Sequence, residues 1–297
     1  PGRDLCGELI IADIGIPDTV IGDIAASTSR NGPALWLSDF PFPNSEAHKY
    51  RRGHAVIAGG AVMTGAARLA AIAARRMGAG LVTIAASREA AAIYAVDTPG
   101  NLVSTKPFTD ILADPRKNAV LVGPGAEVDE ETRARILAAR AANKASVIDA
   151  DALTAFADDP DTLFLAIDAG CVLTPHEGEF ARLFDLEDDK LTRARRAAAA
   201  AGAVVLLKGS DTVIAAPDGR AAINNTGTPY LATGGTGDVL AGMITGLLAQ
   251  GMPAFQAAAA AAWTHGRAAE LFRPGLIAED ITELIPQVLC ELIADVV

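Results

Sequence analysis

Cysteine, histidine and basic residues are scarce in this 297-residue sequence, and each shortage argues against a class of protein. The three cysteines, Cys6, Cys171 and Cys290, lie far apart and form no CxxC pair, so neither a disulfide framework nor a thiolate zinc site is expected. The four histidines form no HExxH motif. The formal net charge of −11, with no basic stripe to offset it, argues against nucleic acid as a partner. We therefore expect a protein of a reducing compartment, the cytoplasm.

Two common nucleotide-binding motifs are also missing. No GxxxxGK[ST] pattern occurs, so a P-loop is excluded. The glycine-rich stretch at residues 59–65 lacks GxGxxG, and no acidic residue closes the next strand, which makes a Rossmann dehydrogenase a weak interpretation.

One long stretch without charge, residues 239–263, has the length of a membrane span. However, Gln250, Gly251 and Pro253 interrupt it, and the remainder is mostly alanine and glycine. Glycine near a helix end and proline near the next helix start indicate two buried helices joined at residues 250–253. No membrane span is therefore expected.

From residue 52 onward, short apolar runs alternate with segments of helical periodicity. Parallel strands are expected at residues 55–58, 81–85, 119–122, 146–148, 172–174 and 204–207. Residues 212–216 and 221–224, joined at Asp218–Gly219, are expected to pair as antiparallel strands, and helices follow from Asp238. The pattern predicts an α/β fold with a mostly parallel central sheet, helices on both faces and an antiparallel edge.

Residues 1–45 differ from the rest of the chain. Residues 35–43 are aromatic-rich, extended and broken by prolines, which is typical of an arm or linker. Such an arm packs either on its own domain or on a neighbouring subunit, and the sequence leaves both open. The chain begins at Pro1 without Met, so we expect it to be a part of something longer. Residues 46–297 are expected to form one domain.

The most informative stretch is the glycine loop from Gly234 to Asp238, which directly precedes an apolar helix. Glycines there leave the first helical N–H groups uncovered, and with the helix dipole these groups make an anion site. A carboxylate at Asp238 repels an anion, but its presence is explained if it has to accept a proton. The alternative is that Asp238 only complements the dipole and that the glycines only form a tight turn.

Several other residues able to contact a ligand lie directly after predicted strands: Gly60, Gly123, Asp149, His176 and Lys208. Ligands of parallel α/β sheets bind at the carboxyl ends of the strands. We therefore expect these residues to converge with the glycine loop on one site.

Each of these residues also has a simpler explanation. Lys208–Thr212 offers a cation, a flexible backbone and two hydroxyls that suit a nucleotide, but the segment is also an ordinary strand end. His176 could hydrogen-bond a substrate or merely cap the helix that follows it. Glu179 could only favour that helix's N-terminus. Asp149 could help to hold a metal through water.

Five blocks in this order resemble the ADP/ATP-dependent NAD(P)H-hydrate dehydratases, which belong to the ribokinase-like superfamily. They are Val122–Gly125, Asp149–Leu153, Thr174–Glu179, Lys208–Gly209 and Gly234–Gly242, and the resemblance covers roughly residues 46–297. Residues 7–17 are similar to the end of the epimerase domain that precedes the dehydratase in bifunctional members. The resemblance implies the C-terminal part of a bifunctional NAD(P)H-hydrate repair enzyme, without epimerase activity.

The activity implied by this resemblance is a repair reaction. A phosphoryl group passes from ADP or ATP to the hydroxyl on carbon 6 of hydrated NADH or NADPH, and phosphate then leaves to restore NAD(P)H. Mg²⁺ bridging the nucleotide phosphates is expected, although no direct protein ligand of the metal is assigned. A homo-oligomer, with a tetramer favoured, is expected as well.

The resemblance also implies roles for individual residues. The catalytic group comprises the amides around Gly235 and Gly237, which stabilise transferred charge, and Asp238, which accepts the hydroxyl proton. Substrate binding falls to Ala66, Gly123, His176 and Asp238, and nucleotide binding to Lys208, Gly209, Ser210, Asp211, Thr212 and Gly237. Met63 departs from the family pattern, in which an aromatic residue is frequent, so the shape of the substrate wall is left open.

Two alternatives remain at this point. A ribokinase-like small-molecule kinase, such as one similar to hydroxyethylthiazole kinase, would use the same carboxylate and anion site but release a stable phosphorylated product. The second alternative is a catalytically silent nucleotide-binding subunit. Such a subunit would not need a catalytic carboxylate, so the presence of Asp238 beside an intact glycine loop argues against this alternative.

Overall fold

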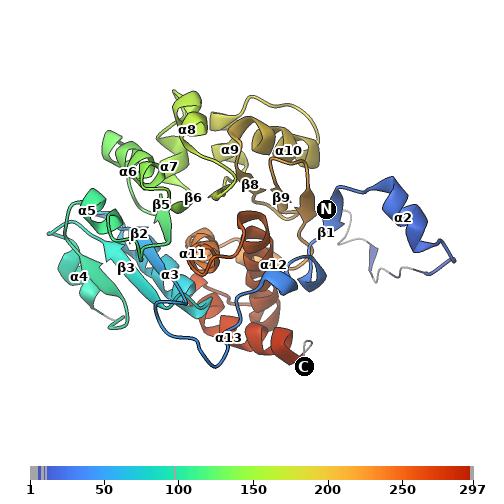
Figure 1. The fold of residues 1–297 in the computed structure, drawn as a ribbon, viewed down its shortest axis with the longest axis horizontal. Helices are drawn as coiled ribbons and strands as arrows, with labels where there is room; N and C mark the ends of the chain where they lie inside the picture. Colours follow the sequence, from blue (N-terminus) through green and yellow to red (C-terminus); the bar gives the residue numbers. More distant parts are fainter. Residues whose placement is uncertain (1–5, 8–9, 11, 97, 295–297) are drawn as a thin grey trace.

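The computed structural model describes residues 6–7, 10, 12–96 and 98–294, and a ten-stranded sheet lies at its centre (Figure 1). The strand order is β1-β10-β9-β8-β7-β6-β5-β2-β3-β4. The strands are β1 (Thr28–Arg30), β2 (His54–Ala58), β3 (Leu81–Ala85), β4 (Leu102–Ser104), β5 (Ala119–Val122), β6 (Ala145–Ile148), β7 (Cys171–Leu173), β8 (Val204–Leu207), β9 (Val213–Ala215) and β10 (Ala221–Ile223).

The sheet is parallel except at β9, which runs antiparallel to both of its neighbours, β8 and β10. This confirms the predicted mostly parallel sheet and the predicted antiparallel pair. The antiparallel strand is not the outermost one, however, because β10 and β1 continue the sheet beyond it, with Thr28 opposite Ala221. Two three-residue strands, β1 and β4, were not predicted from the sequence.

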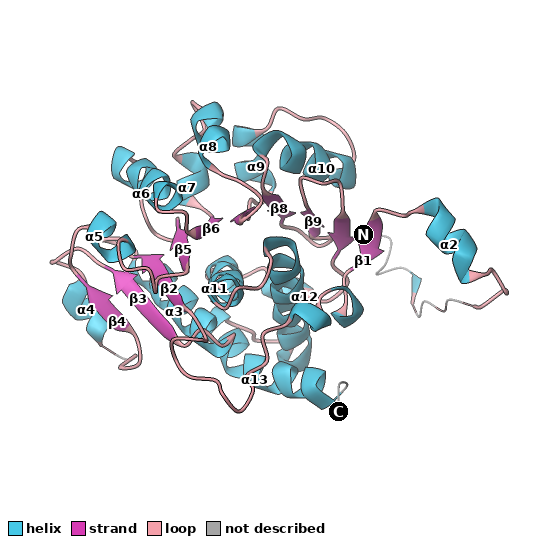
Figure 2. Cartoon of the chain, viewed as in Figure 1, coloured by secondary structure: helices cyan, strands magenta, loops and turns pink. Residues whose placement is uncertain are grey.

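Helices cover both faces of this sheet, as predicted, and the sheet separates them clearly in Figures 1 and 2. One group packs on one face: α3 (Thr64–Arg76), α11 (Thr236–Ala249), α12 (Ala254–Phe272) and α13 (Ala278–Ala294). The second group packs on the other: α5 (Phe108–Leu112), α6 (Glu130–Ala141), α7 (Asp151–Thr154), α8 (Pro160–Ala166), α9 (Glu177–Leu183) and α10 (Lys190–Ala201). Two shorter helices, α2 (Asp18–Ile24) and α4 (Ala91–Ala95), complete the described α-helices.

Strand β2 shows why the sheet needs both layers. Successive side chains of a strand point to opposite faces, and accordingly Ala55 and Ile57 belong to the core under α3 and α11, whereas Val56 and Ala58 belong to the core under α5–α10. All five β2 residues are buried. A continuous apolar run of this kind is expected for a parallel strand that is covered on both sides.

The N-terminal segment packs on its own chain from residue 28 onward. After β1, the 3₁₀ turns η1 (Pro33–Leu35) and η2 (Leu37–Asp39) carry Trp36, which is fully buried with its ring 5.8 Å from that of Trp263. Asn31 is also buried, and its side-chain amide donates to the Ala259 carbonyl at 2.8 Å. Residues 1–5, 8–9 and 11 of the predicted arm lie outside the described part of the chain.

The uncharged stretch forms two helices, α11 and α12, as predicted, and Gly251 between them has a φ of +87°. Among the described residues, no helix has both the length and the apolarity that a membrane crossing requires. Helix α11 lies directly against α3. A Cβ on Gly242 would come within 2.2 Å of the Ala70 carbonyl oxygen, and one on Gly246 within 2.5 Å of that of Ala74. Glycine is therefore needed at both positions for the two backbones to meet.

Candidate active site

The N-terminus of α11 is shaped by Gly235, which has a φ of +91° and precedes the first helical residue. The backbone angle favours glycine, and a Cβ at this position would also lie 2.8 Å from the tip of the Leu69 side chain of α3. No side chain caps the helix. The first amides of this 14-residue helix therefore stay available to an anion, as the sequence predicts.

His265 and the hydroxyl of Thr236 fix the first turn of this helix. The Thr236 hydroxyl donates to the carbonyls of Leu231 and Thr233 at 3.0 and 3.1 Å, and His265 Nε2 lies 3.0 Å from the Thr236 carbonyl oxygen. Since a carbonyl can only accept, this ring nitrogen carries the proton. Burial lowers the pKa of His265 to about 4, so the ring is neutral at physiological pH. The first turn of α11 is thus held both by the loop that precedes it and by His265 of α12.

Lys208 is the cation nearest to this helix end. Its Nζ donates to Asp149 Oδ1 at 2.8 Å and lies 3.7 Å from Glu179 Oε2. A Cβ built on Gly237 would be 3.6 Å from the same nitrogen, which places the ammonium beside the first turn of α11. Burial lowers the pKa of Lys208, but the carboxylates of Asp149, Glu179 and Asp238 outweigh it and raise the pKa overall. Lys208 is therefore charged in this site.

For Asp238, in contrast to Lys208, the site disfavours the charged form. Burial is the main cause that raises its pKa to about 6, and the negative charges of Asp149 and Asp151 add to it, while Lys208 lowers it. An ordinary aspartate in water has a pKa near 4 and is a weak base. At a pKa of about 6, Asp238 is mostly ionised at neutral pH and holds a proton more readily than an exposed aspartate does.

His176 caps α9. Its Nδ1 accepts from the amides of Gly178 and Glu179 at 2.9 and 3.1 Å, while Glu179 Oε2 accepts from the His176 amide at 2.8 Å. This reciprocal pattern is a capping box, so the structural explanation considered for His176 is correct. The His176 side chain is still 55% exposed, and its Nε2 lies 3.3 Å from Glu179 Oε1. Capping and contact with a ligand are thus compatible.

Gly123 lies against Asp149. Its φ is +135°, and a Cβ there would be 1.7 Å from the Asp149 carbonyl oxygen. Gly60 is equally constrained, with a Cβ 1.7 Å from the carbonyl oxygen of Gly125. The ends of β2, β5 and β6 therefore meet through backbone alone. Ala66 lies in the first turn of α3, next to the N-terminus of α11 against which this helix packs.

The segment after β8 is tied together by its own side chains. The Thr212 hydroxyl donates to the Gly209 carbonyl at 2.9 Å, and Lys190 Nζ bridges the Asp211 carboxylate at 2.8 Å and the Lys208 carbonyl at 3.2 Å. Ser210 is exposed. Of the residues predicted to bind nucleotide, Lys208 and Gly237 lie together, whereas the Asp211 carboxylate is already engaged by Lys190.

Three participants in this arrangement were not assigned a role in it from the sequence. Glu179 helps to hold Lys208, His265 fixes the first turn of α11, and Ala150 adopts a φ of +50° between Asp149 and Asp151. A non-glycine residue at positive φ is strained backbone, which persists where the surroundings enforce it. The Asp149 carboxylate, considered as a metal ligand from the sequence, instead forms an ion pair with Lys208.

The donor set fits a metal that is carried by a nucleotide. Within the described residues, no group of three or more His, Cys, Asp or Glu side chains is arranged to hold a metal ion. Mg²⁺ in nucleotide-dependent enzymes is commonly bound through substrate phosphates, waters and only one or two carboxylates. An open helix N-terminus beside Lys208 suits such a metal–nucleotide complex better than a resident ion.

Comparison with solved structures first defines the class. The fold superposes with a TM-score of 0.80 on a ribokinase-like superfamily protein from Enterococcus faecalis, at 25% identity, over 90% of this chain and 96% of that one. It also matches an ADP/ATP-dependent NAD(P)H-hydrate dehydratase from Bacillus subtilis, co-crystallized with ATP and Mg²⁺, with a TM-score of 0.76 and 29% identity, over 89% and 98% of the two chains. The protein thus has a ribokinase-like α/β fold.

The family follows from the sequence matches. The NAD(P)H-hydrate dehydratase family model matches residues 54–287. An ADP-dependent (S)-NAD(P)H-hydrate dehydratase from Neisseria meningitidis is 38% identical, with 80% of this chain and 84% of that protein covered. This chain belongs to the NAD(P)H-hydrate dehydratase family, and the resemblance inferred from its motifs is confirmed.

Other relatives are longer. A bifunctional NAD(P)H-hydrate repair enzyme from Moorella thermoacetica is 38% identical over 98% of this chain, but the match covers 59% of that protein. The chain therefore spans little more than half the length of the bifunctional relatives that it matches.

Proposed function

We propose that this chain uses ADP or ATP to dehydrate hydrated NADH or NADPH at the N-terminus of α11, with Asp238 as the base. Family membership supports the reaction class. One observation carries the residue assignment. A buried Asp238, whose pKa is about 6, lies in the first turn of a helix that has no side-chain cap and that begins beside Lys208. One group suits a hydroxyl proton and the other suits a phosphate.

In the first step, Asp238 accepts the proton of the hydroxyl on carbon 6 while that oxygen attacks the terminal phosphorus of the nucleotide. The new bond is the one between oxygen and phosphorus, and the bond that breaks joins the transferred phosphoryl group to AMP or ADP. The amides at Gly235–Gly237 and the charge of Lys208 stabilise the negative charge on the transferred group. Bound Mg²⁺ would supply further neutralisation of the nucleotide phosphates.

In the second step, phosphate leaves carbon 6 and a proton leaves the neighbouring ring carbon, which restores the double bond of the dihydronicotinamide. The phosphorylated ring is a better substrate for elimination than the alcohol because phosphate is a stable leaving group. The amides that bound the phosphoryl group in the first step remain in contact with it in the second. Ala66, Gly123 and His176 are proposed to position the nicotinamide, and Gly209–Thr212 to contact the nucleotide.

Asp149 and Glu179 act on Lys208 in this proposal. Two carboxylates keep the ammonium charged and directed at the first turn of α11. A nucleotide phosphate brings additional negative charge, which Lys208 is then able to neutralise. His265 has a comparable positioning role, since it holds the carbonyl of the same turn.

A homo-oligomer, with a tetramer favoured, is also proposed. Large apolar side chains are exposed near the N-termini of α3 and α11: Val62, Met63, Tyr230 and Ile277. Exposed apolar clusters are typical of interaction surfaces. Light scattering coupled to size exclusion tests this, and a monomeric mass at all concentrations would contradict it.

The activity is tested by incubating the protein with hydrated NADPH, Mg²⁺ and either ADP or ATP. Recovery of the reduced-nicotinamide absorbance is expected with at least one donor and not without nucleotide. A parallel assay with hydroxyethylthiazole and ATP tests the kinase alternative. Failure of both donors, with a protein shown to be folded by circular dichroism, would contradict the proposal.

A further inference from the structure

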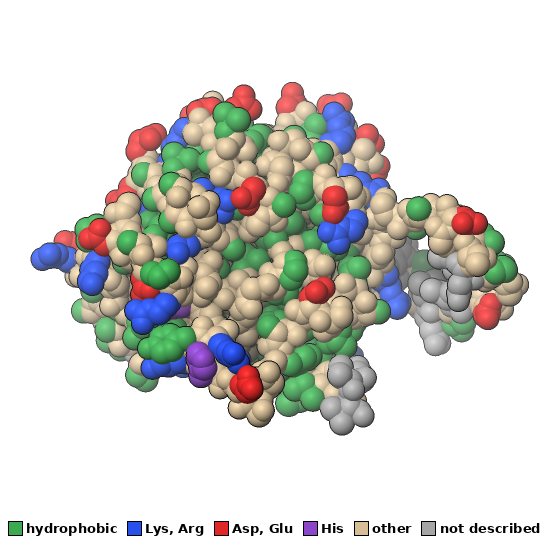
Figure 3. Space-filling model, viewed as in Figure 1, with side chains coloured by type: hydrophobic (Ala, Val, Ile, Leu, Met, Phe, Trp, Pro, Cys, Tyr) green, Lys and Arg blue, Asp and Glu red, His purple; other side chains and the backbone are tan. Residues whose placement is uncertain are grey.

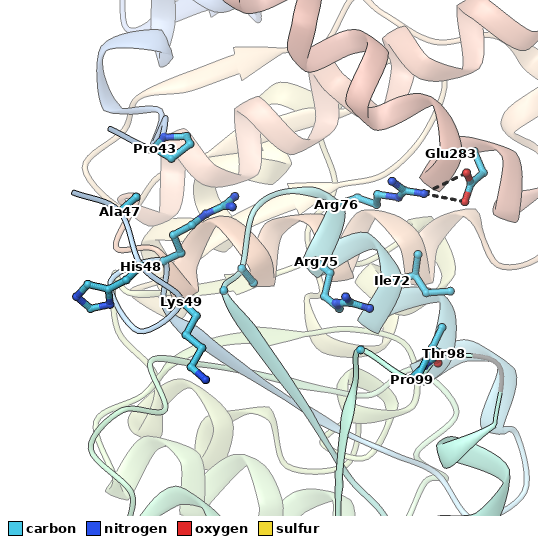
Figure 4. A pocket seen from close by; sticks show the side chains of 14 residues that line it. Pro43, Ala47, His48, Lys49, Ile72, Arg75, Arg76, Thr98, Pro99 and Glu283 are labelled. Atoms are coloured by element: carbon cyan, nitrogen blue, oxygen red, sulfur yellow. Dashed lines mark hydrogen bonds and ion pairs between the residues drawn. The ribbon is translucent and has the colours of Figure 1, made fainter. Parts of the chain in front are cut away.

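A second candidate site lies at the opposite end of the sheet. A cavity of about 940 Å³ is formed by the loop that leads into β2, the C-terminus of α3, the turn at residues 98–100 and one residue of α13 (Figure 4). Gly80, which precedes β3, and Arg52, which shortly precedes β2, both line it. The cavity is therefore at the amino ends of the strands, whereas the candidate active site is at their carboxyl ends.

The cavity concentrates positive charge in an acidic protein. Among the described residues that line it are four Lys and Arg side chains, His48 and one carboxylate, in a chain of net charge −11. The cations are Lys49, Arg52, Arg75 and Arg76, and the carboxylate is Glu283. Figure 4 shows His48 and Lys49 on one wall, and Arg75 and Arg76 of α3 on another. The whole-molecule view has Lys and Arg side chains and a histidine close together at the foot of the face drawn there (Figure 3).

Most of these cations have no counter-ion in the described part of the chain. Arg76 uses the one carboxylate, because its NH2 group donates to both oxygens of Glu283 at 3.1 Å. Lys49, Arg52 and Arg75 form no ion pair with a described residue; Lys49 instead lies over the Tyr50 ring, 5.2 Å from its centre. Like charges repel. Lys49 and Arg75 are exposed, so water screens part of this repulsion, and an anion bound among them would relieve the rest.

Two of the residues that line the cavity also carry a buried polar atom without a partner. Arg52 Nε and the Thr98 hydroxyl oxygen are shielded from solvent and have no hydrogen-bond partner among the described residues. Unsatisfied buried groups of this kind are rare in native proteins and require an explanation.

Helix capping explains only part of the cluster. Arg75 and Arg76 lie in the last turn of α3, where cations interact favourably with the helix dipole. Lys49 and Arg52 belong to a separate loop, so the dipole of α3 does not account for their approach to the same cavity. The convergence of two independent segments is better explained by a shared ligand.

We propose that this cavity binds a small phosphorylated molecule with at least two phosphate groups and an organic part. Guanidinium groups match phosphate oxygens in geometry and charge. The apolar side chains of Ile72 and Pro43 offer contact to the organic part, and the volume is in the range of small-molecule sites. The proposal is independent of the dehydratase activity, since it concerns binding at the other end of the sheet.

Inorganic pyrophosphate is the probe, and its affinity for the full chain is measured by isothermal titration calorimetry at low and high salt. Arg75→Glu and Lys49→Glu are each expected to weaken binding about tenfold or more, because each removes a charged hydrogen-bond donor and adds a repelling charge. High salt should weaken binding to the unaltered protein, and inorganic phosphate should bind less tightly than pyrophosphate. Arg75→Lys should retain part of the affinity.

Two controls separate this site from others. Arg196→Glu makes the same charge change on the exposed face of α10 and should leave pyrophosphate affinity within about twofold. The double variant Lys208→Met/Asp149→Asn removes the active-site cation together with its counter-ion and should leave unchanged the binding that Arg75→Glu weakens. Circular dichroism verifies that every variant is folded.

Three results would overturn the proposal. Equal affinity in the unaltered protein and in Arg75→Glu would remove the cavity from consideration, and loss of binding in the Lys208 double variant would place pyrophosphate in the active site. A shift in oligomeric state in Arg75→Glu, seen by sedimentation velocity without pyrophosphate binding to the unaltered protein, would mean that a second copy covers the cavity.

Discussion

The two ends of the central sheet carry opposite excesses of charge. At the carboxyl ends of the strands, one cation, Lys208, is surrounded by the carboxylates of Asp149, Glu179 and Asp238. At the amino ends, the described residues that line the basic cavity include four cations and one carboxylate, Glu283. An excess of one sign in close quarters is unfavourable by itself. At the first end, burial is the main cause that raises the pKa of Asp238, and the neighbouring negative charges add to it. At the second end, we propose that a bound anion offsets the excess of positive charge.

The largest expected effect is on catalysis at the carboxyl end. Asp238→Asn keeps the size of the side chain but removes the base, and turnover of hydrated NADPH should fall about 10²–10⁴-fold while nucleotide affinity is retained. Steady-state kinetics and calorimetry with ADP measure the two quantities. Asp218→Asn, in the exposed turn before β10, serves as the matched control. Unchanged turnover in Asp238→Asn would exclude Asp238 as the base.

The next effect is on stability at the same end. Lys208→Met leaves the Asp149 carboxylate, 2% exposed, without its partner, and should lower the free energy of unfolding by about 3–5 kcal/mol. Adding Asp149→Asn removes the stranded charge, so the double variant should recover much of the loss. Urea denaturation measures all three proteins. If the double variant is no more stable than Lys208→Met, the unpaired Asp149 carboxylate is not the main cause of the loss of stability.

Asp238 should make both catalysis and the stability of the fold depend on pH, in opposite directions. As a base it must be ionised, so kcat/KM should rise with pH through a midpoint of about 6. Its folded pKa lies above the ordinary value of 3.8, so the folded state binds this proton more tightly than the unfolded chain. The resulting stabilisation is fully present below pH 4 and is lost as pH rises through about 6.

Asp238→Asn tests that sign directly. The variant lacks the titrating group, so at pH 8 it should be more stable than the unaltered protein by on the order of 2 kcal/mol, and the advantage should vanish near pH 4. Thermal unfolding across this pH range measures the difference. If Asp238→Asn and the unaltered protein are equally stable at pH 8 as well as near pH 4, Asp238 is not held in an unfavourable ionised state.

The smallest effect is expected at the amino end. Arg76 and Glu283 are 40% and 68% exposed, so Arg76→Gln should cost at most about 1 kcal/mol of stability. Turnover of hydrated NADPH should change less than twofold, because the residue lies at the far end of the sheet from Asp238. Denaturation and kinetics on the same preparation check both. A loss of turnover comparable to that of Asp238→Asn would erase the distinction between the two ends.

Much of this arrangement follows from sequence pattern, because parallel strands force the residues after them to one edge. Gly123, Asp149, His176 and Lys208 could be grouped on that ground alone. The contact between Lys208 and Asp149 could not be predicted from the sequence, because 59 residues separate the two and several other partners were possible for each. For the same reason the sequence suggested only that Asp149 could help to hold a metal through water, and not that it pairs with Lys208.

Other features lacked a usable signal. Strand β1 (TSR) has no apolar residue and β4 (LVS) has only two, so no apolar run marks either strand. His265 lies within an alanine-rich helix, where nothing in the pattern marks its contact with Thr236. The basic cavity joins residues from four separate segments of the chain, and none of these segments has an unusual composition by itself.

The glycine contacts between α3 and α11 have a mechanical consequence. Because Gly242 and Gly246 bring the backbones together without intervening side chains, no rotamer change can absorb a displacement of one helix against the other. Helix α3 ends at Arg75 and Arg76 in the basic cavity, and α11 begins at the loop that carries Asp238. We therefore expect α3 and α11 to move as one body and not to slide past each other.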